Sequence, residues 1–152
     1  MNTNKKGKNN KAKGEKAQSI VIGHFAKYGI VVALPMSDNL PWDFIAIVKD
    51  ELYKVQVKSA DETRDSDEKR VNFSFRTSNW WKKTTKKYNR KEVDAFIGCD
   101  FIDDKVFLFS YKQFENRRSF TIRKDGKRWK KCNDESLFIL SEKRINEVFV
   151  KE

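Results

Sequence analysis

Apolar positions change their period once along the chain, at Gly29. From Ala17 to Tyr28 apolar residues recur at i, i+3, i+4 and i+7, the spacing of an amphipathic helix. This pattern predicts a helix over Gly14 to Tyr28. Gly29 stands where a glycine in the left-handed conformation ends many helices.

After Gly29 the chain consists of short runs rich in β-branched and aromatic residues, which predict strands. The runs are Ile30 to Leu34, Trp42 to Val48, Leu52 to Ser59, Val71 to Arg76, Asp94 to Cys99, Lys105 to Ser110 and Ser119 to Arg123. The last is expected to return through Arg128 to Lys131 as a hairpin. Ser141 is a plausible N-cap for a terminal helix ending near Val148. Helix, strands and helix together indicate an α/β or α+β domain with a mixed sheet.

The first thirteen residues differ from the rest. They contain five lysines, no acid and almost nothing to bury, which predicts a disordered basic arm over residues 1–13. Residues 14–152 are expected to form a single domain, because the chain is too short for two of ordinary size.

The chain carries a net charge of +11, with 33 Lys and Arg against 22 Asp and Glu. Such a surface favours a polyanionic partner, and double-stranded DNA is the leading candidate. A membrane surface is the alternative, which the interleaving of the cations with Asn, Thr and Trp disfavours. No apolar run approaches the ~20 residues of a membrane span, so a soluble cytoplasmic protein is expected. Cys99 and Cys132 lack zinc-site spacing and are interpreted as reduced thiols.

Two segments separated by a predicted hairpin carry the candidate chemistry: Pro41 to Ile45 and Val55 to Ser59. A turn centred between Lys49 and Asp50 would place Asp43 opposite Gln56, and one shifted by a residue would place it opposite Lys58. Turns with an odd number of loop residues would put Asp43 on the other face. Convergence of the three side chains is therefore a prediction about register.

Phosphodiester hydrolysis uses an oxygen-coordinated Mg²⁺ or Mn²⁺ to activate water and neutralise phosphate charge. Asp43 and Gln56 offer such oxygens, and a lysine on the same face can orient or deprotonate the water and stabilise the oxyanion. Lys58 is in that position. Each of these residues alone is also typical of an ordinary half-exposed strand.

The array of Gly14-Glu15, Asn39 to Asp43 and Val55 to Ala60 resembles the PD-(D/E)xK nuclease superfamily, and Tyr88 to Asp94 with Phe96 extends the similarity. It is most similar to group I intron-encoded homing endonucleases, in which Gln precedes x-Lys. The resemblance covers Gly14 to Ser110. Two departures are that Trp42 separates Pro41 from Asp43, and that Gln56 removes a negative charge.

The resemblance implies a restriction-endonuclease-like α/β core with a mixed sheet flanked by helices. It implies Asp43 as the principal metal ligand, with Gln56 and the Val57 carbonyl completing the site. Lys58 would be the catalytic lysine, and Glu15 a helix-borne carboxylate that binds metal through water.

Two basic clusters are candidate DNA contacts. The residues singled out are Lys82, Lys83, Lys86, Lys87, Arg90, Arg117, Arg118, Arg123, Lys127 and Arg128. In the first cluster the aromatic residues, Tyr88 among them, are interpreted as packing beneath the cations. The second, on the predicted late hairpin, equally suits a groove-binding ribbon, a phosphate clamp or an oligomer surface.

The leading hypothesis is a metal-dependent DNA endonuclease of homing type, acting as a homodimer or higher even assembly because two strands require two sites. A Holliday-junction resolvase-like nuclease is the close alternative. A non-catalytic basic DNA-binding protein is the rival from another class, and an RNA-directed nuclease is a weaker third.

Overall fold

The N-terminal helix is longer than the apolar pattern predicts. The computed structural model describes residues 3–60, 70–79, 84–123 and 133–151, and its first element is α1 (Thr3–Lys27). The segment expected as a disordered arm is therefore helical from Thr3 onward. Apolar periodicity identifies only the part of a helix that packs against the protein. Once that part is helical, each further residue at its end gains one hydrogen bond, so the helix can extend beyond the apolar stripe.

The end of α1 agrees with the prediction. Gly29 has a φ of 69°, and the Gly29 and Ile30 amides donate to the carbonyls of Ala26 and Phe25 at 3.1 and 3.2 Å. This pair of bonds is a Schellman motif, whose C′ position needs positive φ. The chain can therefore turn directly from the helix into the first strand.

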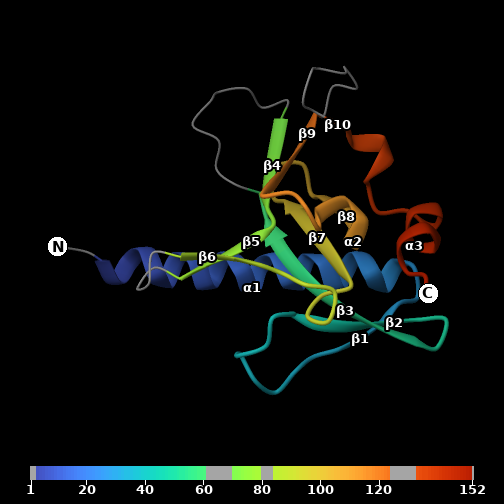
Figure 1. Cartoon of the computed structure of the whole chain (residues 1–152), viewed down its shortest axis with the longest axis horizontal. Coiled ribbons are helices and arrows are strands. Elements are labelled where there is room, and N and C mark those ends of the chain that lie inside the picture. Colours follow the sequence, from blue (N-terminus) through green and yellow to red (C-terminus); the bar gives the residue numbers. More distant parts are fainter. Residues whose placement is uncertain (1–2, 61–69, 80–83, 124–132, 152) are drawn as a thin grey trace.

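A mixed sheet in the order β1-β2-β3-β7-β8 forms the centre of the protein (Figure 1). Its strands are β1 (Val31–Ala33), β2 (Phe44–Val48), β3 (Glu51–Ser59), β7 (Ala95–Asp100) and β8 (Lys105–Ser110). Only β3 and β7 pair in parallel; the other three neighbouring pairs are antiparallel. The predicted mixed sheet is confirmed.

The chain between β3 and β7, together with the segment after β8, builds a second layer. Its sheet has the order β10-β9-β4, and a separate ribbon pairs β5 with β6. The bounds are β4 (Arg70–Ser74), β5 (Arg76–Asn79), β6 (Thr84–Lys87), β9 (Ser119–Arg123) and β10 (Asn133–Asp134). In Figure 1 the ribbon extends toward the N-terminal end of α1.

The partner of β9 is not a hairpin neighbour. β9 pairs antiparallel with β4, which lies far earlier in the chain, and parallel with β10. The predicted return strand, Arg128 to Lys131, lies outside the described residues. The last elements are α2 (Tyr111–Phe114), a 3-10 helix η1 (Glu135–Leu137) and α3 (Glu142–Val148).

The two faces of the central sheet have different cores. One face packs on α1 and α3 through mostly aliphatic side chains such as Val21, Val55 and Ile97. The other is dominated by phenylalanine, including Phe73, Phe96 and Phe107, and is covered by β4, β9 and α2. Side chains alternate between faces along each strand, so odd-numbered residues of β3 pack beneath α1 and even-numbered ones face the second layer.

α3 begins as predicted, with Ser141 as N-cap accepting from the Arg144 amide at 3.1 Å. The buried Arg144 guanidinium donates through Nε and Nη2 to the Leu108 carbonyl, at 3.0 and 2.9 Å. α3 is thus fixed to the edge strand β8 by a buried cation whose donors are satisfied.

Cys99 is a free thiol buried in the core, as predicted. Burial, reinforced by Asp100, raises its pKa to about 11, so the thiol stays protonated. Cys132 lies outside the described residues. None of the helices in the described part of the chain is long and apolar enough to span a membrane.

Gly98 lies where the two layers approach each other closely. A Cβ at this position would lie 2.7 Å from the Phe73 ring. We expect Gly98→Ala to destabilise the protein by about 1–3 kcal/mol through overpacking, measured by chemical denaturation. Gly23→Ala in α1, where nothing lies within 4 Å, is the matched control. It should be neutral or stabilising by up to about 1 kcal/mol; equal effects of both substitutions would contradict the close packing.

Candidate active site

A two-residue turn sets the register of the β2–β3 hairpin. Lys49 and Asp50 have φ values of 50° and 64°, and positive φ at both central residues is the signature of a type I′ turn. Phe44 pairs with Val55 and Val48 with Glu51, the register of a turn centred between Lys49 and Asp50. The strand pairing ends at Phe44, and Asp43 precedes it, outside the ladder. The first of the predicted turns is therefore the one observed.

The Asp43 carboxylate is held against β3. Its amide donates to the Val55 carbonyl at 2.8 Å, and its Oδ2 accepts from the Val57 amide at 2.7 Å. Burial raises the pKa of Asp43 above its ordinary value, while the Val57 hydrogen bond and the Lys58 charge act in the opposite direction. The other carboxylate oxygen, Oδ1, is not used by this hydrogen bond and is the candidate metal ligand.

Gln56 lies on β3 between Val55, whose carbonyl accepts from the Asp43 amide, and Val57, whose amide donates to the Asp43 carboxylate. Its side chain is partly buried, and Nε2 donates to the Val57 carbonyl at 3.4 Å. Two of the predicted metal donors, the Gln56 amide and the Val57 carbonyl, are therefore neighbours.

Lys58 follows Gln56 by two residues and so points to the same face. Its Nζ donates to the Arg76 carbonyl at 3.3 Å and lies 5.6 Å from the centre of the Tyr88 ring. Tyr88 is buried against Phe96, which agrees with its interpretation as a packed aromatic. The ammonium is thus held by the start of β5 on one side and by an aromatic ring on the other.

Arg76 was not singled out in the sequence. Besides its carbonyl contact with Lys58, its Nε is buried and makes no hydrogen bond to the described residues. Buried donors are usually paired, so this nitrogen is suited to an acceptor brought by a ligand. The only sequence signal was its place at the end of the predicted strand Val71 to Arg76.

Glu15 is not brought to these residues. Its side chain is exposed on α1, which covers the opposite face of the sheet from Asp43, Gln56 and Lys58. Among the described residues, no group of three or more Asp, Glu, His or Cys could hold a metal ion. The site as it stands offers one carboxylate, an amide and a main-chain carbonyl.

The predicted DNA contacts fall into several places. Lys86 and Lys87 are exposed on β6, pairing with Glu92 and, at 3.2 Å, with Asn116 Oδ1. Arg117 and Arg118 are exposed before β9, and Arg123 at its end is partly buried. Lys82, Lys83, Lys127 and Arg128 lie outside the described residues.

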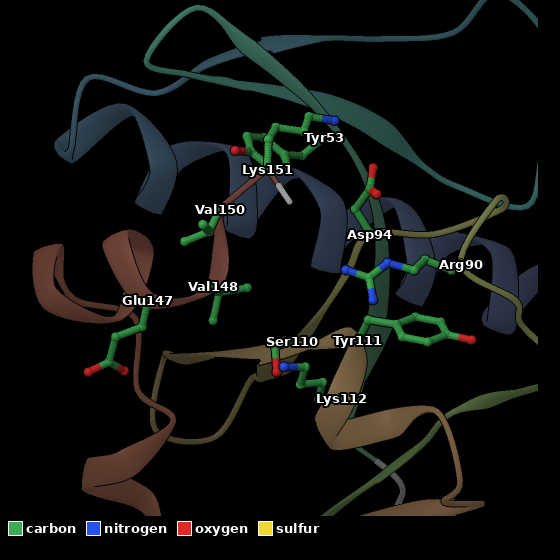
Figure 2. A pocket seen from close by; sticks show the side chains of 10 residues that line it. All are labelled: Tyr53, Arg90, Asp94, Ser110, Tyr111, Lys112, Glu147, Val148, Val150 and Lys151. Atoms are coloured by element: carbon green, nitrogen blue, oxygen red, sulfur yellow. The ribbon is translucent and has the colours of Figure 1, made fainter.

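Arg90 lines a pocket of about 580 Å³ at the other end of β3 and β7. Figure 2 shows its guanidinium between Asp94 and Tyr111, and the Tyr111 ring centre is 5.3 Å away. Lys112 and Lys151 also line the pocket, whereas Asp43, Gln56 and Lys58 do not. This pocket is therefore separate from the candidate active site.

Comparisons with known proteins bear on this geometry. The sequence model of the PD-(D/E)XK endonucleases matches residues 8–136. The fold is similar to that of a bacterial homing endonuclease, I-Ssp6803I, with a TM-score of 0.72 and 22% identity over 85% of this chain and 87% of that chain. A comparison with curated protein sequences gave no match.

The pKa of Asp43 provides a direct test of the site geometry. We expect its carboxyl to titrate above 3.8 in a ¹³C NMR titration, because burial disfavours the charged form. Lys58→Met should raise the pKa further by removing a stabilising positive charge. Lys54→Met, on the same face of β3 but four residues away, is the control and should leave it unchanged. Equal responses to the two substitutions would show that Lys58 does not act on Asp43.

Proposed function

Because the chain belongs to the PD-(D/E)XK endonuclease family, we propose that it is a metal-dependent DNA endonuclease that hydrolyses phosphodiester bonds. The observation that carries the proposal is the Asp43 carboxylate, fixed to the Val57 amide of β3 within electrostatic reach of Lys58, which shares a face of β3 with Gln56. An acidic oxygen beside an ammonium, in a chain of net charge +11, suits a phosphate substrate.

The donor set fits Mg²⁺ or Mn²⁺. Asp43, Gln56 and the Val57 carbonyl would supply hard oxygen ligands, which both cations prefer. Bound there, the cation would supply Lewis-acid neutralisation of phosphate charge and a more acidic water. One carboxylate gives weak affinity by itself, so substrate phosphate oxygens are expected to complete the site. Glu15, exposed on α1 across the sheet, is left out of this donor set.

Lys58 is proposed as the catalytic lysine. Its contacts with the Arg76 carbonyl and the Tyr88 ring hold the ammonium near Asp43, where it can orient water and stabilise negative charge on the phosphate. Arg76 is proposed to donate its buried Nε to a phosphate oxygen, since that nitrogen has no hydrogen-bond partner among the described residues. Lys58 and Arg76 would both stabilise the negative charge that develops on the phosphate during hydrolysis.

The β5–β6 ribbon is proposed as the main contact with double-stranded DNA. It begins at Arg76, beside Lys58, and its outer strand exposes Thr84, Thr85, Lys86 and Lys87. Lysines bind phosphates, and hydroxyls donate to phosphates or base edges. The exposed Arg117 and Arg118 are candidates for a second phosphate contact, and Lys82, Lys83, Arg90, Arg123, Lys127 and Arg128 remain predictions.

Homing-type double-strand cleavage by a homodimer or higher even assembly is the form of activity we favour. The fold similarity to a bacterial homing endonuclease supports that choice over a Holliday-junction resolvase. Faster cleavage of four-way junctions than of linear duplex would reverse the preference. The absence of an acid at position 56 keeps a non-catalytic DNA-binding protein as the second candidate.

Plasmid cleavage tests the site. We expect purified protein to cut supercoiled plasmid with Mg²⁺ or Mn²⁺ and to stop with EDTA. Lys58→Met should lower the rate at least about 100-fold, in line with the loss of acid–base and electrostatic catalysis. Lys54→Met, on the same strand and face, is the control and should retain cleavage.

Cleavage that survives EDTA or the Lys58 substitution would refute the assigned site. Tight binding without cleavage, over several divalent metals and DNA structures, would favour the non-catalytic alternative.

DNA binding tests the ribbon. We expect Lys86→Ala/Lys87→Ala to weaken binding and to reduce the slope of log K against log salt by about 2, roughly one per lost phosphate contact. Fluorescence anisotropy at several salt concentrations measures both. Lys27→Ala/Lys143→Ala removes the same charge from exposed sites on α1 and α3 and should leave the slope unchanged. Equal slope changes for the two double variants would refute a local contact.

A further inference from the structure

The outer face of the β1–β2–β3 region is apolar, and none of the described helices or strands packs over it. The sheet register aligns Val31, Ile47 and Leu52 in one row, and Ala33, Ile45 and Lys54 in the next. Lys54 lies at the border of the face, where its Nζ donates to the Lys91 carbonyl at 2.6 Å. The five apolar residues of these rows, here called the apolar face, point away from α1, because their neighbours Val32, Ala46 and Val48 pack on the α1 side. Along β3 the same face continues through Lys54 to Gln56 and Lys58 of the candidate active site.

Large apolar side chains on and beside the apolar face are exposed to solvent. Val31 and Leu52 keep 62% and 56% of their surface accessible, and Leu34 and Met36, in the loop that follows β1, keep 60% and 107%. Figure 1 shows β1 and β2 on the opposite side of α1 from β4 and β9. The second layer that covers the phenylalanine core thus does not extend over this face. Contiguous apolar surface of this kind typically marks a protein interface.

Charge separates this region from the rest of the chain. Residues 30–52 contain four acids and one base, a net charge of −3 in a chain of +11. Apolar side chains without donors, next to Asp50 and Glu51, make a poor surface for a polyanion. A protein partner is therefore favoured over DNA.

We propose that the apolar face, with the loop from Leu34 to Leu40, is the surface through which two copies of this chain associate. Copies with a charge of +11 repel one another, and the region with net negative charge is where they can approach with least repulsion. An apolar face is self-complementary, as a two-fold interface requires. Exposed Lys49 and Glu51 at its rim provide opposite charges that can meet across such an axis.

The position of the face agrees with this partner. Asp43 precedes Ile45 by two residues in the sequence, so association here places the second active site near the first. The choice of a second copy, rather than another protein, rests on the proposed function, because cutting both strands of a duplex needs two sites.

The test is the mass of the full-length protein in solution. Light scattering after size-exclusion chromatography, at a salt concentration that screens nonspecific contacts, should give an even multiple of 18.0 kDa for the wild type. Val31→Lys/Leu52→Lys should give 18.0 kDa, because each copy then brings two buried charges to the interface. Ile102→Lys/Leu137→Lys adds the same charge at two other exposed apolar residues and should keep the wild-type mass.

Circular dichroism and thermal melting establish whether the Lys variants are folded. If the Val31/Leu52 variant does not fold, hydrogen exchange of the β1 and β2 amides in the wild type provides the test. If the apolar face is an interface, these amides should exchange more slowly as the protein concentration rises. A monomeric wild type, a mass that the Val31/Leu52 variant does not change, or exchange independent of concentration would overturn the proposal. None of these measurements uses DNA or metal. They therefore test the interface independently of the nuclease assignment.

Discussion

The turn at Lys49 and Asp50 sets the one register on which the rest of the site depends. Both residues have positive φ, a conformation that costs about 1–2 kcal/mol per non-glycine residue relative to the right-handed region. This cost is outweighed by the backbone hydrogen bonds between the two strands that the turn joins, and by the burial of Phe44, Ala46 and Val48. A slip of one residue would send those side chains to the other face of the sheet and move Asp43 away from the Val57 amide.

β3 is the strand that both halves of the protein share. Its neighbours on each side fix it with a carboxylate, since Asp43 accepts from the Val57 amide and Asp94 accepts from the Lys54 amide at 2.8 Å. The alternation of side chains then gives the strand two functions at once. Val55 and Val57 belong to the core beneath α1, while Gln56 and Lys58 remain available on the other face.

Charge is distributed unevenly between the candidate site and the rest of the molecule. The chain as a whole is strongly basic, yet its candidate site brings together one carboxylate and the neighbouring Lys58 and Arg76. A site with few negative charges attracts phosphate more readily and binds a free divalent cation more weakly. This balance favours joint binding of metal and DNA. The acids of the β2–β3 turn, Asp50 and Glu51, lie instead at the end of the hairpin away from Asp43.

Local patterns in the sequence determined the strands of the central sheet together with β4 and β9, the glycine stop of α1 and the Ser141 cap, because each depends on residues a few positions apart. The polar strands β5 and β6 and the short β10 carry no such pattern and were not predicted. The same is true of Gln56 and Lys58 sharing a face, and of the finite set of registers for Asp43. Tertiary structure decided what depends on distant partners: β9 pairs with β4, Phe73 packs against Gly98, and the Arg76 carbonyl meets Lys58. It also placed Glu15 on the far side of the sheet from Asp43 and extended α1 beyond its apolar stripe. The spacing of apolar residues in the sequence does not predict these features, because they arise from contacts that form only when the whole sheet is assembled.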